Sequence, residues 1–140
     1  MIVVDTNIWS ETLRDHPSPL VLAWMRRHHS EVFLPVVTRH ELRVGVLQLP
    51  SGRRQDSLGA LIDRMLERMS ARTLPYDIAA AEAHARIRAA AHEAGRALSA
   101  EDGQILGIAA AHGASVATRN VRDFQAHGVP IIDPWTPPEP

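Results

Sequence analysis

The chain has 140 residues, a length that predicts one domain able to bury about two-thirds of its unfolded surface. Hydrophobic residues make up 45% of the chain and charged residues 22%, a balance typical of a packed core and not of a disordered chain. The formal net charge is −1, so no overall basic field indicates a nucleic-acid partner.

Several residue types are absent, and their absence excludes particular chemistries. All 15 basic residues are Arg; without Lys the chain cannot use Schiff-base catalysis, a P-loop lysine or a receiver-like phospho-acceptor site. It has no Cys, which excludes disulfides, thiolate metal ligands and cysteine nucleophiles. No signal peptide is visible, and no apolar run approaches the roughly 20 residues of a membrane span. We therefore expect a cytoplasmic protein with no membrane attachment.

Predicted strands and helices alternate along the chain. Apolar runs predict short strands at residues 2–4, 32–37, 73–75, 115–118 and 130–132. Helical spacing and capping signals predict helices at residues 8–13, 20–29, 38–49, 58–69, 77–94, 100–112 and 121–126. With no hairpin signal, this order predicts an α/β fold in which helices flank a central parallel sheet of about four or five strands. We expect one domain over residues 1–135 and a flexible Pro-rich tail at 136–140.

Three carboxylates stand where predicted strands end or predicted helices begin. Asp5 ends the first strand, while Glu41 and Asp102 lie in the first turns of two helices. Open parallel sheets bind ligands beyond the carboxyl ends of their strands, so these side chains could meet there. Mg²⁺ and Mn²⁺ prefer such hard oxygen ligands, and a metal ion held this way could activate water against a phosphodiester.

A purely structural interpretation fits the same residues. The segments Thr38–Glu41 and Ser99–Asp102 both match the capping box, and acidic side chains are favoured in the first turn of any helix. Asp5 could equally cap a helix or form a turn. Capping and catalysis do not exclude one another, and both interpretations stay open at this point.

Five segments together resemble the PIN-domain ribonuclease toxins of the VapC type, especially their FitB-like branch. The segments occur in the family's order and span nearly the whole chain: IVVDTN (2–7), LPVVTRHEL (34–42), LSAEDGQI (98–105), VATRNVRDF (116–124) and DPW (133–135). Each motif alone is weak, but the ordered set is specific. The resemblance implies a PIN-like three-layer fold and a Mg²⁺-dependent endoribonuclease, with Mn²⁺ as a possible replacement.

The resemblance also implies roles for individual residues. Asp5, Glu41 and Asp102 would form the acidic pocket, with Asp5 and Asp102 as the primary metal ligands. Support would come from three polar side chains, Thr6, Asn7 and Thr118. For the family's fourth pocket position two residues compete, Asn120 and Asp123. With Asn120 in it the pocket has one charge fewer, which leaves the number of metal ions open; we favour Asp123 acting electrostatically and Asn120 contacting a water.

The resemblance further implies partners. These are an RNA substrate, a second copy of the chain in a homodimer, and a small cognate antitoxin whose tail occupies the pocket in a larger assembly. Four arginines near the pocket motifs could hold RNA phosphates: Arg39, Arg43, Arg119 and Arg122. A solvated face or ordinary ion pairing explains them equally well. The 51–57 segment with Arg53 and Arg54 is expected to be a solvated loop.

The sequence thus predicts the toxin of a type II toxin–antitoxin system, a metal-dependent endoribonuclease that leaves 5′-phosphate and 3′-hydroxyl ends. The alternative is a catalytically silent PIN domain that binds RNA or an antitoxin. Mg²⁺-stimulated cleavage separates the two.

Overall fold

The structure, a computed structural model, describes residues 1–140. Its centre is a five-stranded sheet in which every neighbouring pair is parallel and the strand order is β3-β2-β1-β4-β5. The strands are short: β1 (Ile2–Val4), β2 (Val32–Pro35), β3 (Thr73–Leu74), β4 (Ser115–Ala117) and β5 (Ile131–Ile132). The predicted α/β class with a parallel sheet is confirmed.

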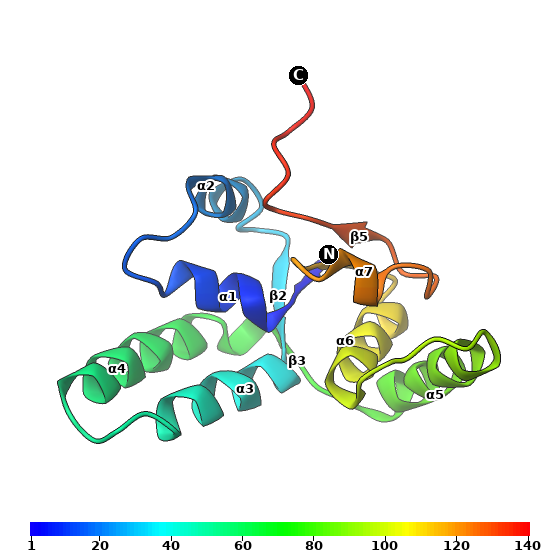
Figure 1. Cartoon of the computed structure of the whole chain (residues 1–140), viewed down its shortest axis with the longest axis horizontal. Helices are drawn as coiled ribbons and strands as arrows, with labels where there is room; N and C mark the ends of the chain where they lie inside the picture. The colour runs from blue at the N-terminus through cyan, green and yellow to red at the C-terminus, as the bar shows by residue number, and fades with distance from the viewer.

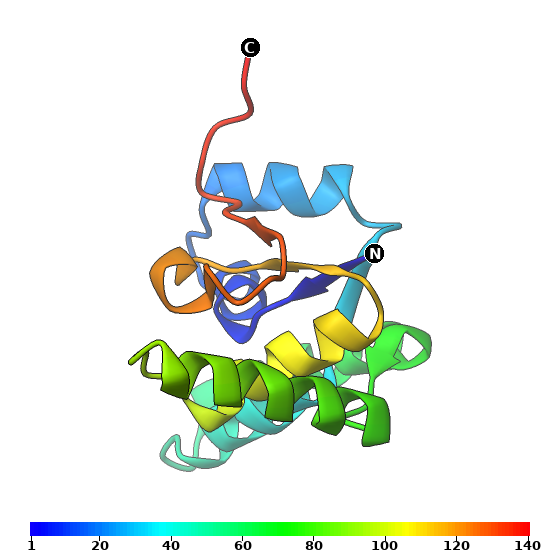
Figure 2. The ribbon, with the colours of Figure 1, turned by 90° about the vertical axis from the view of Figure 1, so that its right-hand side faces the viewer.

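Helices connect the strands and cover both faces of the sheet. They are α1 (Thr6–Thr12), α2 (Pro19–Arg27), α3 (Val36–Leu47), α4 (Arg53–Arg68), α5 (Ile78–Glu93), α6 (Ala100–Ala111) and α7 (Val121–Phe124), with a single 3-10 turn, η1 (Ser70–Arg72), before β3. In Figure 1, α1, α2 and α4 lie to the left of the sheet, and α5 and α6 to its right. Figure 2 looks onto the second side, where α5 and α6 run side by side.

The two layers follow from the alternation of side chains along β1. Ile2 and Val4 point to one face and pack with buried side chains of α1, α2 and α4. Val3 points to the other face, into a cluster formed mainly by α5, α6 and β4. Because both faces are covered, all three residues of this central strand are apolar and buried.

Two helices begin earlier than the sequence pattern suggested. Helix α3 starts at Val36, directly after Pro35, so Val36 and Val37 belong to the helix and not to a strand. Helix α4 starts at Arg53, so Arg53 and Arg54 form its first turn instead of a loop. In both places the predicted start of the helix followed the apolar or polar character of the sequence. The packing of the folded chain sets the actual start several residues earlier or at a different residue type.

The C-terminal segment divides into a held part and a projecting part. Asp133 accepts a hydrogen bond from the Trp135 amide at 2.9 Å, which closes a turn directly after β5. Residues 136–140 have no regular structure and extend away from the body in both views (Figures 1 and 2). None of the helices combines the length and apolar character that a membrane span requires.

Candidate active site

Asp5 lies at the point where the strand order changes direction. The chain leaves β1 towards β2 on one side, and β4 pairs with β1 on the other. In open parallel sheets this switch point, at the carboxyl end of the strands, is where ligands bind. Asp5 follows the last residue of β1, and Thr118 follows the last residue of β4.

The Asp5 carboxylate is buried and held by two hydrogen bonds. Its Oδ1 accepts from the Thr6 amide at 2.7 Å, which caps helix α1, and its Oδ2 accepts from the Thr118 hydroxyl at 2.8 Å. The Thr118 hydroxyl oxygen also accepts from the Asn120 amide at 3.0 Å and, at 3.4 Å, from the Asn7 side chain. Asp5 therefore caps a helix and presents a fixed carboxylate at the same time.

A second link joins α1 to α3. Thr38 does not cap α3 as the capping box suggested, because that helix begins at Val36 and Pro35 precedes it without a side-chain cap. Instead, Thr38 is fully buried in the first turns of α3, and its hydroxyl shares a 2.9 Å hydrogen bond with that of Thr6. This hydrogen bond holds the start of α3 beside Thr6, the residue that follows Asp5. Glu41 lies on the next turn of α3.

Asp102 is brought to the site by the first turn of α6. Ser99 caps this helix, with its hydroxyl accepting from the Asp102 amide at 3.2 Å, so the cap predicted at Ser99 is present. Helix α6 lies very close to α5: a Cβ on Gly103 would stand only 2.1 Å from His84 Nε2. Gly103 thus allows the approach of the two helices that sets the position of Asp102.

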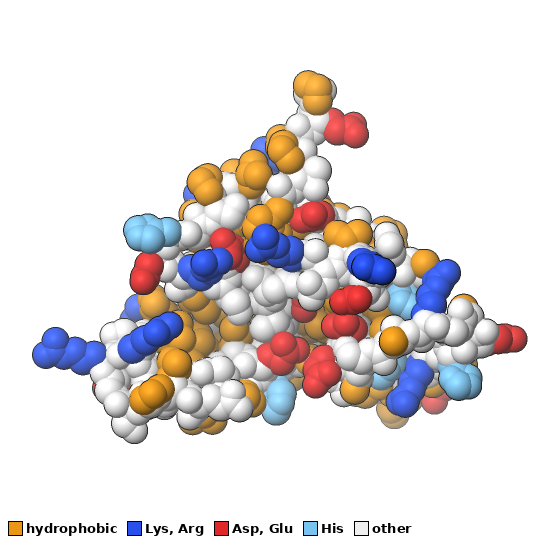
Figure 3. All heavy atoms as spheres, viewed as in Figure 1, with side chains coloured by type: hydrophobic (Ala, Val, Ile, Leu, Met, Phe, Trp, Pro, Cys, Tyr) orange, Lys and Arg blue, Asp and Glu red, His pale blue; other side chains and the backbone are white.

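The three carboxylates influence one another electrostatically. Burial raises the pKa of Asp5, although Thr118 and Thr6 oppose the shift. Burial and the nearby charge of Asp5 raise the pKa of Glu41, and the same two causes raise the pKa of Asp102. Figure 3 shows acidic side chains gathered at the middle of this face, with a row of basic side chains above them over α1 and α7. Asp5 therefore lies near enough to both Glu41 and Asp102 for its charge to disfavour their ionisation.

The donor set suits a hard divalent cation that keeps most of its water. No three His, Cys, Asp or Glu side chains are grouped closely enough to hold an ion by themselves. Mg²⁺ is commonly bound through one or two carboxylates, with waters and substrate phosphate completing the shell. A buried carboxylate beside two half-buried ones whose pKa values are raised meets that description, because a cation would relieve their mutual repulsion.

The two candidates for the fourth position occupy different places. The Asn120 amide is bound to Thr118, and its side chain makes no capping hydrogen bond to α7. Asp123, on the first turn of α7, adds to the negative charge that raises the pKa of Asp102. Of the two, Asp123 acts on a pocket carboxylate.

The four arginines near the pocket are placed unequally. The guanidinium of Arg43 is paired with Asp63 of α4, so it is committed to a contact between helices. Arg39 and Arg122 are exposed on α3 and α7. Arg119 donates its amide to Asn7 Oδ1 at 3.4 Å, and its guanidinium lies over the Trp135 ring, 4.8 Å from the ring centroid.

Two residues at this site were missed from the sequence. Glu11 is buried on α1, where it accepts from the Ser18 amide at 2.9 Å and pairs with Arg14 at 3.1 Å. Its position three residues after Ile8, on the apolar side of α1, was the only signal that it might be buried. Trp135, which the sequence pattern gave no role of its own, lies under the guanidinium of Arg119.

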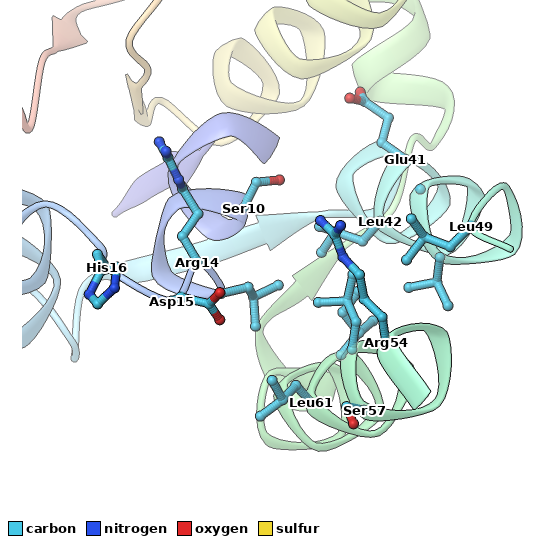
Figure 4. A pocket seen from close by; sticks show the side chains of 15 residues that line it. Ser10, Arg14, Asp15, His16, Glu41, Leu42, Leu49, Arg54, Ser57 and Leu61 are labelled. Atoms are coloured by element: carbon cyan, nitrogen blue, oxygen red, sulfur yellow. The ribbon is translucent and has the colours of Figure 1, made fainter. Parts of the chain in front are cut away.

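A groove of about 750 Å³ runs from Glu41 between α1, α3 and α4 (Figure 4). Its floor is apolar, with Leu42, Val46 and Leu58, and Arg14 and Arg54 line it from two sides. Leu61 of α4 remains 42% exposed there, which is unusual for a large aliphatic side chain. Of the three carboxylates, Glu41 lines this partly apolar groove.

Comparison with known proteins agrees with this geometry. The PIN-domain family model matches residues 2–129, and the chain belongs to the PIN-domain family. It is 38% identical over 139 residues to the VapC ribonuclease Y4jK of Sinorhizobium fredii, covering 98% of this chain and 99% of that protein. It is 37% identical over 137 residues to the toxin FitB of Neisseria gonorrhoeae, covering 96% and 99%.

Solved structures give the same family. A chain of the crystal structure of FitAcB from Neisseria gonorrhoeae matches with a TM-score of 0.90 and 36% identity, over 96% of this chain and 99% of that one. The structure of FitAB bound to the IR36 DNA fragment gives a TM-score of 0.93 and 35% identity over 99% of both chains. The resemblance found in the sequence, to the VapC type and its FitB-like branch, is confirmed.

Proposed function

We propose that this chain is a Mg²⁺-dependent endoribonuclease and the toxin of a type II toxin–antitoxin pair. The observation that carries this proposal is the place of buried Asp5 at the switch point of a parallel sheet, near enough to half-buried Glu41 and Asp102 that its charge raises the pKa of both. The names of its relatives, a VapC ribonuclease and the toxin FitB, support the same activity.

In the proposed reaction, Asp5 and Asp102 would hold the ion. When bound, Mg²⁺ supplies Lewis-acid stabilisation of the charge that develops on the phosphate and its leaving oxygen. Thr118 and the Thr6 amide keep the Asp5 carboxylate in one orientation, so little rearrangement is needed on binding.

Glu41 is the residue suited to handle the proton. Its raised pKa makes it a stronger base than an ordinary carboxylate, although the Thr6 hydroxyl opposes that shift. A Glu41 oxygen would orient a water and accept its proton as the water attacks phosphorus in line with the 3′ oxygen. The products would be 5′-phosphate and 3′-hydroxyl ends.

The test is cleavage of cellular RNA by the purified chain with and without Mg²⁺. Asp5→Asn should abolish cleavage, while Asp56→Asn, which removes an exposed carboxylate from α4, should leave it unchanged. Circular dichroism should show that both variants are folded. Undiminished cleavage by folded Asp5→Asn would refute the assignment.

A second candidate function is a silent PIN domain that binds RNA or antitoxin without cleaving. It is favoured by the absence of three grouped metal-binding side chains and by Asn120, which supplies an amide where another acid could stand. Metal titration decides between the two candidates: RNA binding without Mg²⁺-stimulated cleavage would establish the silent module.

We also propose that a segment of a small antitoxin occupies the groove between α1, α3 and α4. An amphipathic helix fits such a groove by burying its apolar face, here against Leu58 and Leu61. The structures of FitAcB, FitAB and VapBC complexes are similar to this chain, which supports a partner of that kind. Leu61→Arg should prevent co-purification with the antitoxin while RNA cleavage persists.

We propose a homodimer whose interface includes three exposed apolar side chains outside the groove, those of Val36, Tyr76 and Ile78. Pro35 pairs with Leu74 at the end of β2 and β3, so the residues that follow these strands lie beside one another. Ile78 is 83% exposed, and Val36 and Tyr76 are also exposed. Light scattering should give a dimer for the native chain and a monomer for Ile78→Arg.

A further inference from the structure

Arg119 has an unusual arrangement for an exposed arginine. Its backbone is tied to the pocket, because the preceding Thr118 holds Asp5 and its own amide donates to Asn7. Its guanidinium is stacked on Trp135, 4.8 Å from the ring centroid. An arginine side chain normally samples many rotamers, and stacking on an aromatic face restricts that freedom.

Trp135 is itself held rigidly enough to act as a support. Its amide donates to Asp133 in the turn after β5, and β5 is hydrogen-bonded to β4 beside the pocket. The ring is half-buried and packs against the core cluster that contains Ile8 and Trp9. One side of the ring system therefore rests on the core, and the guanidinium of Arg119 covers another part.

A buried carboxylate lies on the α1 side of the same arginine. The Ser18 amide and, more weakly, the Arg14 and Arg119 guanidiniums hold the pKa of Glu11 below its ordinary value, against an opposing effect of burial. Glu11 forms its direct ion pair with Arg14, 3.1 Å away. Its negative charge thus attracts Arg119 as well as its direct partner Arg14.

We propose that Trp135 is a positioning residue that holds Arg119 at the pocket rim, where Arg119 clamps an RNA phosphate next to the scissile one. This inference rests on the proposed ribonuclease function and assigns its substrate contact. A guanidinium stacked through its face still has its N–H edge free, and that edge binds phosphate oxygens through paired, charge-assisted hydrogen bonds. A phosphate contact is independent of base identity, so the clamp orients the strand without selecting its sequence.

Arginine is required for this arrangement and lysine would not replace it. An ammonium keeps the charge but lacks both the planar face that stacks on the indole and the paired donors. Arg119→Lys therefore keeps the positive charge but removes the planar face and the paired donors. Because Arg119 is exposed, the variant should fold normally. Trp135→Phe keeps an aromatic face, whereas Trp135→Ala removes it.

The experiment measures binding of a fluorescein-labelled single-stranded oligoadenylate by fluorescence anisotropy in EDTA, so that no cleavage interferes. Arg119→Ala should weaken binding about tenfold, the loss expected for hydrogen bonds to a charged group. It should also reduce the slope of log affinity against log salt by about 0.7, the value for one phosphate contact on a single strand. Trp135→Ala should weaken binding about two- to fivefold, and Trp135→Phe should restore most of it.

Arg27→Ala is the matched control, because it removes the same charge at the end of α2, beside the amino end of β2 and away from the pocket. It should bind as the native chain does. If Arg119→Lys and Trp135→Ala fold but bind like Arg27→Ala, or if the native chain does not bind the oligonucleotide, the clamp is wrong. If the variants lose only the antitoxin, Arg119 recognises a partner's carboxylate and the RNA clamp is also wrong.

Steady-state cleavage separates this inference from the proposed function. The clamp predicts a raised KM with kcat little changed in Arg119→Lys and Trp135→Ala, since a flanking contact is equally strong in the ground and transition states. If Trp135 only stabilised the fold, Trp135→Ala would lower kcat as well, and Trp135→Phe would not restore activity. If the chain binds RNA through Arg119 but never cleaves it, the phosphate contact of Arg119 is supported. The proposed ribonuclease activity is then wrong.

Discussion

The proposed acidic pocket has two halves that are built differently. The strand half consists of Asp5 and its partners at the ends of β1 and β4, where each carboxylate oxygen accepts a hydrogen bond of 2.7 to 2.8 Å. The helix half consists of Glu41 and Asp102, which are half-buried on the second turn of α3 and the first turn of α6. Their positions depend on how these helices pack, through Thr38 and Gly103.

The difference shows how such a site can be both fixed and adaptable. Asp5 has little freedom, because moving it would break bonds that also hold the segment after β4. Glu41 and Asp102 carry raised pKa values and can change protonation or position when a cation arrives. We expect the strand half to define where the ion sits and the helix half to set how strongly it is held.

The largest effect should come from Asp102→Asn. Loss of a ligand carboxylate should reduce RNA cleavage on the order of a thousandfold, the rate equivalent of several kcal/mol of charge stabilisation. Because ionised Asp102 is disfavoured by burial and by Asp5, the same change should raise the free energy of unfolding by about 0.5 kcal/mol, a small value because the side chain is partly exposed. Cleavage assays and urea unfolding measure the two effects.

Glu82→Gln is the control for that variant, since Glu82 is exposed on α5 and is not among the charges that raise the pKa of Glu41 or Asp102. It should retain near-native cleavage. An Asp102→Asn variant that lost both activity and stability would mean that Asp102 is a structural residue and that the helix half does not hold a cation.

Thr118→Val should test the strand half with a smaller effect. It keeps the shape of the side chain but removes the hydroxyl that donates to Asp5 and accepts from Asn120. Loss of such a supporting contact commonly costs about 10- to 100-fold in metal affinity or activity, and unsatisfied buried groups cost about 1–3 kcal/mol of stability. Thr118→Ser, which restores the hydroxyl, should recover most of both; equal defects in the two variants would contradict the role of this hydrogen bond.

Gly103→Ala should move the helix half alone. The added Cβ would stand 2.1 Å from His84 Nε2, so either the buried His84 ring or α6 must move, at a cost of about 1–3 kcal/mol for overpacking. The matched control is Gly45→Ala in α3, where a Cβ meets no atom within 4 Å and helix propensity should add about 0.5–1 kcal/mol. Thermal unfolding measures both changes in stability. Gly103→Ala should also weaken Mg²⁺ binding because Asp102 moves. Unchanged Mg²⁺ affinity would show that α6 does not set the position of this ligand.

Much of the strand half could be predicted from the sequence. A short apolar run ending in an acid predicts a buried strand with a carboxylate at its carboxyl end, and Asp5 lies there. Capping signals were equally local: Ser99 and Asp77 cap their helices as predicted. These features depend on neighbouring residues, which is why the sequence pattern contains them.

The features that were missed depend on contacts distant in sequence. Thr38 matched a capping box, yet its hydroxyl binds Thr6, 32 residues away. Trp135 and Arg119 come together only because β4 and β5 pair. Arg43 was grouped with pocket arginines because of its position in a motif, but helix geometry turns it towards Asp63.

The smallest expected effect is the pH dependence of stabilisation by Mg²⁺. The pKa values of Asp5, Glu41 and Asp102 lie above their ordinary values of 3.8, 4.5 and 3.8, so between the ordinary and the raised values the folded state binds more protons than the unfolded state. Through these groups, stability falls as pH rises through that window, because the folded pocket must then accommodate repelling charges. Added Mg²⁺ should offset the repulsion and raise the Tm by about 3 °C near neutral pH. This rise in Tm should disappear as the pH falls from the raised pKa values to the ordinary ones.

The difference between melting curves in Mg²⁺ and in EDTA isolates this effect, because Glu11, whose pKa is lowered, contributes a pH dependence of opposite sign that cancels in the subtraction. Asp102→Asn should reduce the Mg²⁺-dependent gain and shift its loss to lower pH, since one of the mutually repelling groups is gone. A gain that is constant with pH, or equal in Asp102→Asn, would mean that the cation binds outside the pocket. The helix half would then have no part in holding the ion.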